Sequence, residues 1–189
     1  MEAIDLIELN QLYAAGDTQS LAAHPKIYLK PEWAMEIATN LERADAGDDL
    51  PDEEDAKLLP ARIALAKNPA LANLPEVAMK LAGDEDGLVA EALAWNPLLP
   101  QLPEVAMKLA KSAGSWVCET LAHNPALAEL PEVALALSHD YHERVRSNLA
   151  SNPAIAQLPA EVPLVLSYDP ERLVRYSLDR RLLNQEGIN

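Results

Sequence analysis

The chain contains a motif whose parts return at a fixed interval, and its clearest copy runs Asn68-Pro69-Ala70-Leu71-Ala72-Asn73-Leu74-Pro75-Glu76-Val77-Ala78-Met79-Lys80-Leu81-Ala82. Asn-Pro stands at residues 68, 96, 124 and 152, and Leu-Pro at 74, 102, 130 and 158, so both pairs recur every 28 residues. A fixed period of about 20 to 50 residues is typical of proteins that stack one structural unit many times. The pattern therefore predicts a stacked-repeat architecture.

Each repeat has the same predicted parts. Asn68 is a natural N-cap and Pro69 a natural first helical residue, so the pair starts a short turn, of 3-10 type, that runs through Ala72. Leu74 precedes a proline and is kept out of the α region, and Pro75 then starts a helix of about nine residues. A turn and a second helix follow, and we expect the second helices at 87–95, 115–123 and 143–151.

The first helix of each repeat has two different faces. Val77, Ala78 and Leu81 are expected to face inward. Glu76 and Lys80 stand at i and i+4, as do Glu104 and Lys108, which indicates a stripe exposed to solvent. Because one such unit cannot cover its own apolar face, the units have to stack.

The ends of the chain read as caps on this stack. Residues 1–23 form an N-terminal cap, with a helix at 3–14 ended by Gly16-Asp17 and a short helix, capped by Asp17 or Thr18, through Ala23. His24-Pro25 is a degenerate Asn-Pro that opens a first repeat at 24–68, regular repeats fill 69–168, and residues 169–189, with a last helix at 171–183, form a C-terminal cap. We therefore predict one all-α domain over 1–189, a right-handed α-solenoid of about five 28-residue repeats with short 3-10 turns and terminal capping helices.

Composition supports helices and narrows the classes of function. Phe is absent, and Val, Ile and Thr are too thinly spread to build a sheet. The net charge of -15 argues against binding to a phosphate backbone, although it suits a basic protein partner. The single cysteine, Cys118, excludes an internal disulfide, and we see neither a signal peptide nor a membrane span. We expect a monomer without cofactor or metal in a bacterial-type cytoplasm.

Segments late in the chain follow a recognisable order: Leu137-Ser138-His139-Asp140, then Val145-Arg146-Ser147-Asn148-Leu149-Ala150-Ser151-Asn152-Pro153, then Leu166-Ser167-Tyr168-Asp169-Pro170 and Val174-Arg175. This order resembles the leucine-rich repeat variant family, in which Leu-Ala-x-Asp, Val-Arg and Ala-x-Asn-Pro succeed one another. The resemblance covers residues from about 20 to 183, although the period of 28 is longer than that of the family, and the chain lacks the Cys-rich iron–sulfur segment of some members. It implies a HEAT-like solenoid of α-helices and short 3-10 helices, and little about function.

Several patterns could be mistaken for catalytic or metal sites. Helix capping accounts for the repeated Asn and Pro residues. The run His139-Asp140-Tyr141-His142-Glu143 could offer metal ligands, but a capping turn explains it, with Asp140 as the cap. Cys118 and His123 would point about 140° apart on one helix, so they cannot form a nucleophile–base pair. Because the sequence offers no other catalytic pair, we predict that the protein is not an enzyme. Because some HEAT-like solenoids excise DNA bases, a base-excision enzyme is the enzymatic alternative, and it would use the arginines at 144, 146, 172, 175, 180 and 181.

An acidic insertion lengthens the first repeat at about residues 44–57. Such a charge block cannot bury itself, and we expect it to form a mobile loop. An alternative function follows from it: an immunity or inhibitor protein that neutralises a basic toxin or nucleic-acid-binding protein. The acids of this loop are Asp45, Asp48, Asp49, Asp52, Glu53, Glu54 and Asp55.

One column of the second helices varies while the rest of the repeat stays constant. Lys67, Trp95, His123 and Ser151 precede the four Asn-Pro pairs, and the residues one and two turns before them vary as well. A scaffold that keeps its frame and varies one stripe presents a ligand surface, unless these side chains form the core between repeats. We predict non-enzymatic protein–protein recognition through this contact stripe, which comprises Leu88, Glu91, Trp95, Trp116, Glu119, His123, Arg144 and Ser147.

Overall fold

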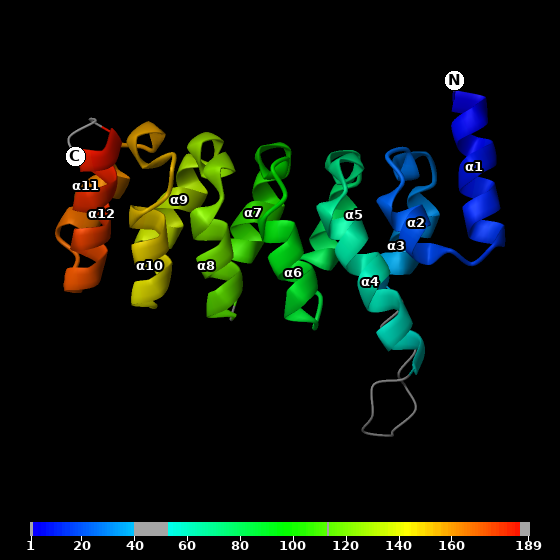
Figure 1. The fold of residues 1–189 in the computed structure, drawn as a ribbon, viewed down its shortest axis with the longest axis horizontal. Helices are drawn as coiled ribbons and strands as arrows, with labels where there is room; N and C mark the ends of the chain where they lie inside the picture. The colour runs from blue at the N-terminus through cyan, green and yellow to red at the C-terminus, as the bar shows by residue number, and fades with distance from the viewer. Residues whose placement is uncertain (1, 40–52, 113, 186–189) are drawn as a thin grey trace. The chain divides into compact units, whose positions relative to one another are not determined.

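The computed structural model describes residues 2–39, 53–112 and 114–185, and these residues form twelve α-helices, five 3-10 helices and no strand. The all-α class predicted from the sequence is therefore confirmed. The chain divides into two compact units, Met1–Asn96 and Pro97–Asn189, each of which is described by itself. Figure 1 shows the order of the helices along the chain.

Unit 1 places its helices in two layers. One layer is the succession of α2, α4 and α6, in which each helix packs on the next, and α3 packs on α5 in the other. The 3-10 helices η1 and η2 also contact each other, and α1 packs against α2. The elements are α1 (Glu2–Ala14), α2 (Thr18–Ala23), η1 (Ile27–Leu29), α3 (Pro31–Thr39), α4 (Glu53–Lys67), η2 (Pro69–Asn73), α5 (Pro75–Leu81) and α6 (Gly87–Ala94).

Unit 2 is arranged in the same way. Here α8, α10 and α12 pack in succession in one layer, α7, α9 and α11 in the other, and η3 contacts η4. The elements are η3 (Leu99–Gln101), α7 (Pro103–Ala110), α8 (Ser115–His123), η4 (Pro125–Glu129), α9 (Pro131–Ser138), α10 (Glu143–Ala150), η5 (Ile155–Gln157), α11 (Glu161–Ser167) and α12 (Arg172–Gln185).

Local sequence accounts for where these helices begin and end. Pro75, Pro103 and Pro131 are the first residues of their helices, as predicted. Asp17 caps α2 through its carboxylate, which accepts from Ser20 N at 3.0 Å, and Gly16, at φ 68°, follows α1. The predicted inward positions are buried in every repeat, with Val77, Ala78 and Leu81 and their counterparts at 105, 106, 109, 133, 134 and 137.

Buried asparagines connect one copy of the motif with the copy before it. Asn152 Oδ1 accepts from Ala154 N in the turn before η5, and its Nδ2 donates back to the carbonyl oxygens of Ala122 (2.6 Å) and Asn124 (3.1 Å). Asn68 does the same in unit 1, since its Nδ2 donates to the carbonyls of Ala22 and His24. The predicted capping role is confirmed for Asn68 and Asn124, whereas the N-cap residues of η3 and η5 are Leu98 and Ala154. The amide groups of Asn68 and Asn152 also link residues 28 to 46 positions apart.

His24 takes the place of asparagine at the start of unit 1. Its Nδ1 accepts from Lys26 N at 3.1 Å, as Asn68 Oδ1 accepts from Ala70 N. His24 is buried, and its Nε2 lies 3.6 Å from Glu8 of α1. The imidazole therefore serves as a cap and also contacts the first helix of the chain.

The structure departs from the sequence-based expectations in two places. Helix α11 begins at Glu161 and not at Pro159, because Ala160 is inserted between the proline and the Glu-Val pair, which shifts everything after it by one residue. The acidic insertion was expected to stay a loop as far as Lys57, but α4 begins at Glu53. Acidic residues are favoured in a first helical turn by the helix dipole, which explains the helical state of Glu53, Glu54 and Asp55.

Candidate functional site

In unit 1 the contact stripe lies on α6. Leu88, Glu91 and Trp95 share one face of this helix, while its other face is buried against α4. Leu88 is 45% exposed and Trp95 is 50% exposed, and Glu91 is half-buried. Two large apolar side chains thus lie on the surface of unit 1, beside a carboxylate.

The stripe residues of unit 2 lie on α8 and α10, which pack side by side. Trp116 is 44% exposed, His123 and Arg144 are exposed, and Glu119 is half-buried. Asn148 Nδ2 donates to the Glu119 carbonyl oxygen at 3.3 Å and ties the two helices together here. The structure therefore brings four of the predicted unit 2 residues to one surface: Trp116, Glu119, His123 and Arg144.

Ser147 is placed differently from its predicted role. It is only 8% exposed, and its hydroxyl lies 2.9 Å from Ser177 Oγ of α12. This hydroxyl pair joins α10 to α12 beneath the stripe. Ser147 thus supports the surface and contributes little area to it.

Gly114 sets the position of the Trp116 ring. A Cβ atom at Gly114 would come within 2.7 Å of Trp116 Nε1 and 2.9 Å of Trp116 Cδ1, so the indole lies directly against the backbone at this N-cap. Only glycine leaves room for the ring there. Asp86 and His142 take the corresponding N-cap positions of α6 and α10, so the glycine is particular to the repeat that carries Trp116.

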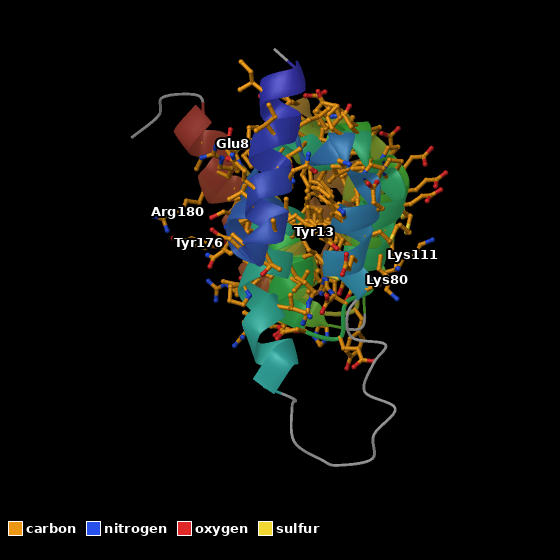
Figure 2. The ribbon with its side chains drawn as sticks, turned by 90° about the vertical axis from the view of Figure 1, so that its right-hand side faces the viewer. Glu8, Tyr13, Lys80, Lys111, Tyr176 and Arg180 are labelled. Carbon is orange, nitrogen blue, oxygen red and sulfur yellow. The ribbon has the colours of Figure 1, made fainter. Side chains whose placement is uncertain are left out.

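The sequence reasoning missed the last members of the stripe, which lie on α12. A hollow of about 360 Å³ lies along this helix beside the end of α10, and its lining residues are Ser151, Leu173, Tyr176, Ser177, Arg180 and Arg181. Figure 2 shows Tyr176 and Arg180 on the same side of unit 2, with Lys111 of the other layer on the opposite side. Leu173 and Tyr176 are 56% and 60% exposed. Carrying the stripe one repeat further, with a step of 29 residues in place of 28, would have found Leu173, Tyr176 and Arg180.

The arginines that could have formed a basic region for nucleic acid are partly occupied. Arg146 is paired with Asp169 through Nε and Nη2 (2.6 and 3.2 Å), and its Nη1 donates to the carbonyls of Asp140 and Tyr141. Arg175 Nη1 donates to the carbonyls of Asp169 and Pro170. The acidic side chains buried in the described residues, Asp84 and Asp169, each lie against an arginine. The base-excision alternative stays a prediction.

Cys118 is buried and held as a thiol. Its Sγ lies 3.5 to 3.7 Å from the carbonyl oxygens of Leu109, Ala110 and Ser112 at the end of α7. Burial, with a further effect from the charge of Asp140, raises the pKa of this thiol to about 11. Because the thiolate is the nucleophilic form, these surroundings suit a structural cysteine.

The prediction that Asp140 caps the helix after the turn from His139 to Glu143 is wrong, because α10 has no side-chain cap. Asp140 Oδ1 accepts from His142 N at 2.8 Å, and His142 is the N-cap residue of α10, so Asp140 stabilises the turn before the helix and not the helix start itself. Within the described ranges no group of three or more His, Cys, Asp and Glu side chains is placed to hold a metal ion. No helix in those ranges is both long and apolar enough to span a bilayer.

The acidic insertion is described only in part. Asp45, Asp48, Asp49 and Asp52 lie outside the described residues, and Glu53, Glu54 and Asp55 belong to the first turn of α4. The inhibitor function suggested for this segment stays a prediction.

Comparison with known proteins identifies no relative: no family model, no curated protein and no solved structure matches the chain. The helical fold and the surfaces of the two units therefore carry the functional argument.

Proposed function

We propose that this protein is a non-enzymatic scaffold for protein–protein recognition that binds its partner through the contact stripe. The single observation that carries the proposal is the exposure of Leu88, Trp95 and Trp116, which are 44 to 50% exposed at the one column that varies between repeats. Tryptophan contributes more than most residues to interface energies, because a large rigid side chain loses little conformational entropy when it is covered.

The core packing and the backbone hydrogen bonds of each repeat do not require these side chains. The cores of both units are filled by the recurring Val, Ala and Leu positions, and the buried asparagines complete the backbone hydrogen bonds between motifs. The stripe is thus free for a ligand, since stability does not demand large apolar residues at these exposed positions.

The architecture that we propose for the scaffold is a right-handed α-solenoid of about five repeats, similar to the leucine-rich repeat variant family. Its support is the 28-residue period of Asn-Pro and Leu-Pro, together with the two-layer order that recurs in each unit. Such a frame holds a column of surface positions in register, which is how stacked repeats build extended binding surfaces.

The experiment compares partner capture by the wild-type protein and by W95A, W116A and the double variant. Bait protein is incubated with native lysate, and the partner found with wild type is then titrated against each variant. We expect each single substitution to weaken the complex by about 30-fold, the effect of a hot-spot residue. The helical circular dichroism signal should not change, because both side chains lie outside the core.

The matched control is Tyr168→Ala, which removes an aromatic side chain that is 82% exposed in a turn outside the stripe. It should leave the affinity unchanged. Unchanged affinity of the double tryptophan variant would contradict the proposal, and so would an equal loss in the Tyr168→Ala variant.

A further inference from the structure

A second surface lies in the layer of unit 2 that does not carry the stripe. Between α7 and α9 the structure has an open groove of about 620 Å³. Its apolar lining includes Pro103, Met107 and Pro131, and the glutamates at its rim are Glu104, Glu129 and Glu132. All three glutamates are exposed, whereas Met107 is half-buried. The groove therefore offers apolar contact at its base and negative charge around it.

The same groove occurs independently in unit 1, between α3 and α5, with a volume of about 440 Å³. Met35 takes the place of Met107, and Glu32 and Glu76 take the places of Glu104 and Glu132. Asn73 stands where unit 2 has Glu129, so the unit 1 groove has one carboxylate fewer. Two copies with the same lining indicate that the groove belongs to the repeated frame, and the larger and more acidic copy lies in unit 2.

The methionines of the chain are concentrated at this position. Of its four methionines, Met35, Met79 and Met107 all stand four residues after the proline that starts their helix. Helix capping explains the recurring Pro and Glu residues, but it does not call for methionine. An unbranched thioether adapts its shape to different partners, and for this reason methionine is frequent at adaptable binding surfaces.

The charge of the groove is not balanced within the described part of the chain. Glu104, Glu129 and Glu132 take part in no ion pair there, and no basic residue lines the groove. Lys108 of α7 and Lys111, which follows that helix, are the nearest bases along the chain and are not among the lining residues. The net charge of -15 adds a long-range attraction for positively charged segments.

We infer that the groove between α7 and α9 docks a segment of a partner protein that carries an apolar side chain flanked by lysine or arginine. The apolar side chain covers Met107 and the prolines, and the flanking cations face the rim glutamates. The α3–α5 groove binds the same chemistry more weakly, because it is smaller and has two rim carboxylates. This inference does not depend on the contact stripe, which lies in the other layer of helices.

The test uses the full chain labelled with ¹³C at the methionine methyl groups, which gives one NMR signal for each of Met1, Met35, Met79 and Met107. Single Met→Leu variants assign the signals. The probe is an acetylated eight-residue peptide of alternating lysine and leucine. A peptide of alternating lysine and serine removes the apolar anchor. A peptide of alternating glutamate and leucine keeps the anchor and reverses the charge.

We expect the Lys–Leu peptide to shift the Met107 signal saturably and to shift the Met35 signal at higher concentration, with Met1 unaffected. The variant E104Q/E132Q should weaken binding about tenfold. Its matched control, E143Q/E171Q, also removes two negative charges, but at exposed helix-start positions outside the groove. This control should bind the peptide like wild type. The double variant W95A/W116A should keep the Met107 response, so that failure of the stripe and failure of the groove are told apart.

Three results would overturn the inference. The first is peptide binding without a change in the chemical shifts of the methionine signals, because the peptide would then occupy another acidic surface. The second is equal binding of the Lys–Ser peptide, which would reduce the effect to general attraction between charges. The third is absence of a saturable Met107 response to the Lys–Leu peptide.

Discussion

Arg62 with Asp84 in unit 1 and Arg146 with Asp169 in unit 2 occupy the same places in their units, but their hydrogen bonds differ. Arg146 makes two hydrogen bonds to the Asp169 carboxylate and two more to turn carbonyls. Arg62 Nε lies 3.1 Å from Asp84 Oδ2 without the alignment of a hydrogen bond, and Arg62 Nη1 has no partner among the described residues. Both arginine side chains are largely buried, so the difference affects stability.

The reason lies in the chain segment before each arginine. In unit 2, residues 140 and 141 form the turn that precedes α10, and their carbonyl oxygens accept from Arg146. The corresponding residues of unit 1, at 56 and 57, lie inside α4, because that helix begins at Glu53. A helical carbonyl is directed along its own helix, whereas a turn carbonyl is available to a side chain. The insertion in the first repeat therefore removed the acceptors that Arg62 would need.

The two repeats between Arg62 and Arg146 have no arginine at this repeat position. Ala90 and Cys118 stand at the same repeat position as the two arginines, and both are buried. The Cys118 thiol approaches the carbonyls at the end of α7, which makes it a small, weak substitute for a guanidinium group. The comparison teaches that a buried ion pair stabilises a repeat only where its other donors and acceptors are also satisfied.

The largest expected effect comes from breaking the complete pair. Arg146→Met leaves the Asp169 carboxylate buried without its cation and two turn carbonyls without a donor, and we expect a loss of about 3–5 kcal/mol in the free energy of unfolding. Arg62→Met should cost less than half of this, because Asp84 can take up a proton. Urea unfolding followed by circular dichroism measures both variants, and equal losses would remove the distinction between the two pairs.

The buried asparagines differ from the ion pairs, because Asn68 in unit 1 and Asn152 in unit 2 make the same kind of hydrogen bonds. Asn68→Ala and Asn152→Ala each remove the acceptor of a nearby backbone N–H and leave two buried carbonyls without a donor. We expect each substitution to cost about 2–3 kcal/mol, with values within about 1 kcal/mol of one another. The measurement is the same urea titration. A much smaller loss at either position would show that water replaces the amide group there.

Replacement of a whole ion pair by apolar residues should again change stability differently in the two units. The variant R62M/D84L removes two poorly bonded charges from an apolar site, and we expect stability within about 1 kcal/mol of wild type or above it. The variant R146M/D169L should lose about 2 kcal/mol, because the carbonyls of Asp140 and Tyr141 are left without a donor. A stabilised R146M/D169L variant would contradict our account of the unit 2 pair.

The two carboxylates should also respond to acid in opposite directions. Burial raises the pKa of Asp84 above its ordinary value of 3.8, and the hydrogen bond from Asp86 N–H and the charge of Arg62 offset this only in part. Burial also acts to raise the pKa of Asp169, but the hydrogen bonds from Arg146 and from Glu171 N–H and the nearby arginine charges hold this pKa below 3.8.

It follows that the stability from ionised Asp169 is present above pH 3.8 and is lost as the pH falls through the lower pKa of the folded state. Protonated Asp84 instead favours the folded state, and this contribution is lost as the pH rises from 3.8 through its raised pKa. Between pH 6 and pH 3, the variant R62M/D84L should lose stability more steeply than wild type, and R146M/D169L less steeply. Parallel slopes for all three proteins would contradict these pKa shifts.

The smallest effect concerns Cys118, which replaces arginine in the same column. With its pKa raised to about 11 and its side chain buried, it should react with a thiol-specific disulfide reagent at pH 8 at least about 100-fold more slowly than a free cysteine. Unfolding in urea should restore the ordinary rate. Rapid labelling of the native protein would show that the end of α7 opens readily.

Local sequence predicted the helices well and the site in part. Helix starts such as Pro103 and caps such as Asn124 depend on bonds within a few residues, which a pattern reveals. The exposure of Trp95 and Trp116 agrees with the predicted stripe, although its binding role is a proposal. Burial of Ser147 could not be predicted, because it depends on Ser177, thirty residues away.

The sequence by itself determined the helical class, the 28-residue period and the inward faces, since each follows from residue spacing and from the conformational limits of proline and asparagine. Only the packing of the helices decided where the hollow beside α12 opens and how Met107 comes to lie among the groove glutamates. These features arise between elements more than twenty residues apart in the chain. Packing between these elements determines which side chains meet, and the local spacing of residues does not predict these contacts.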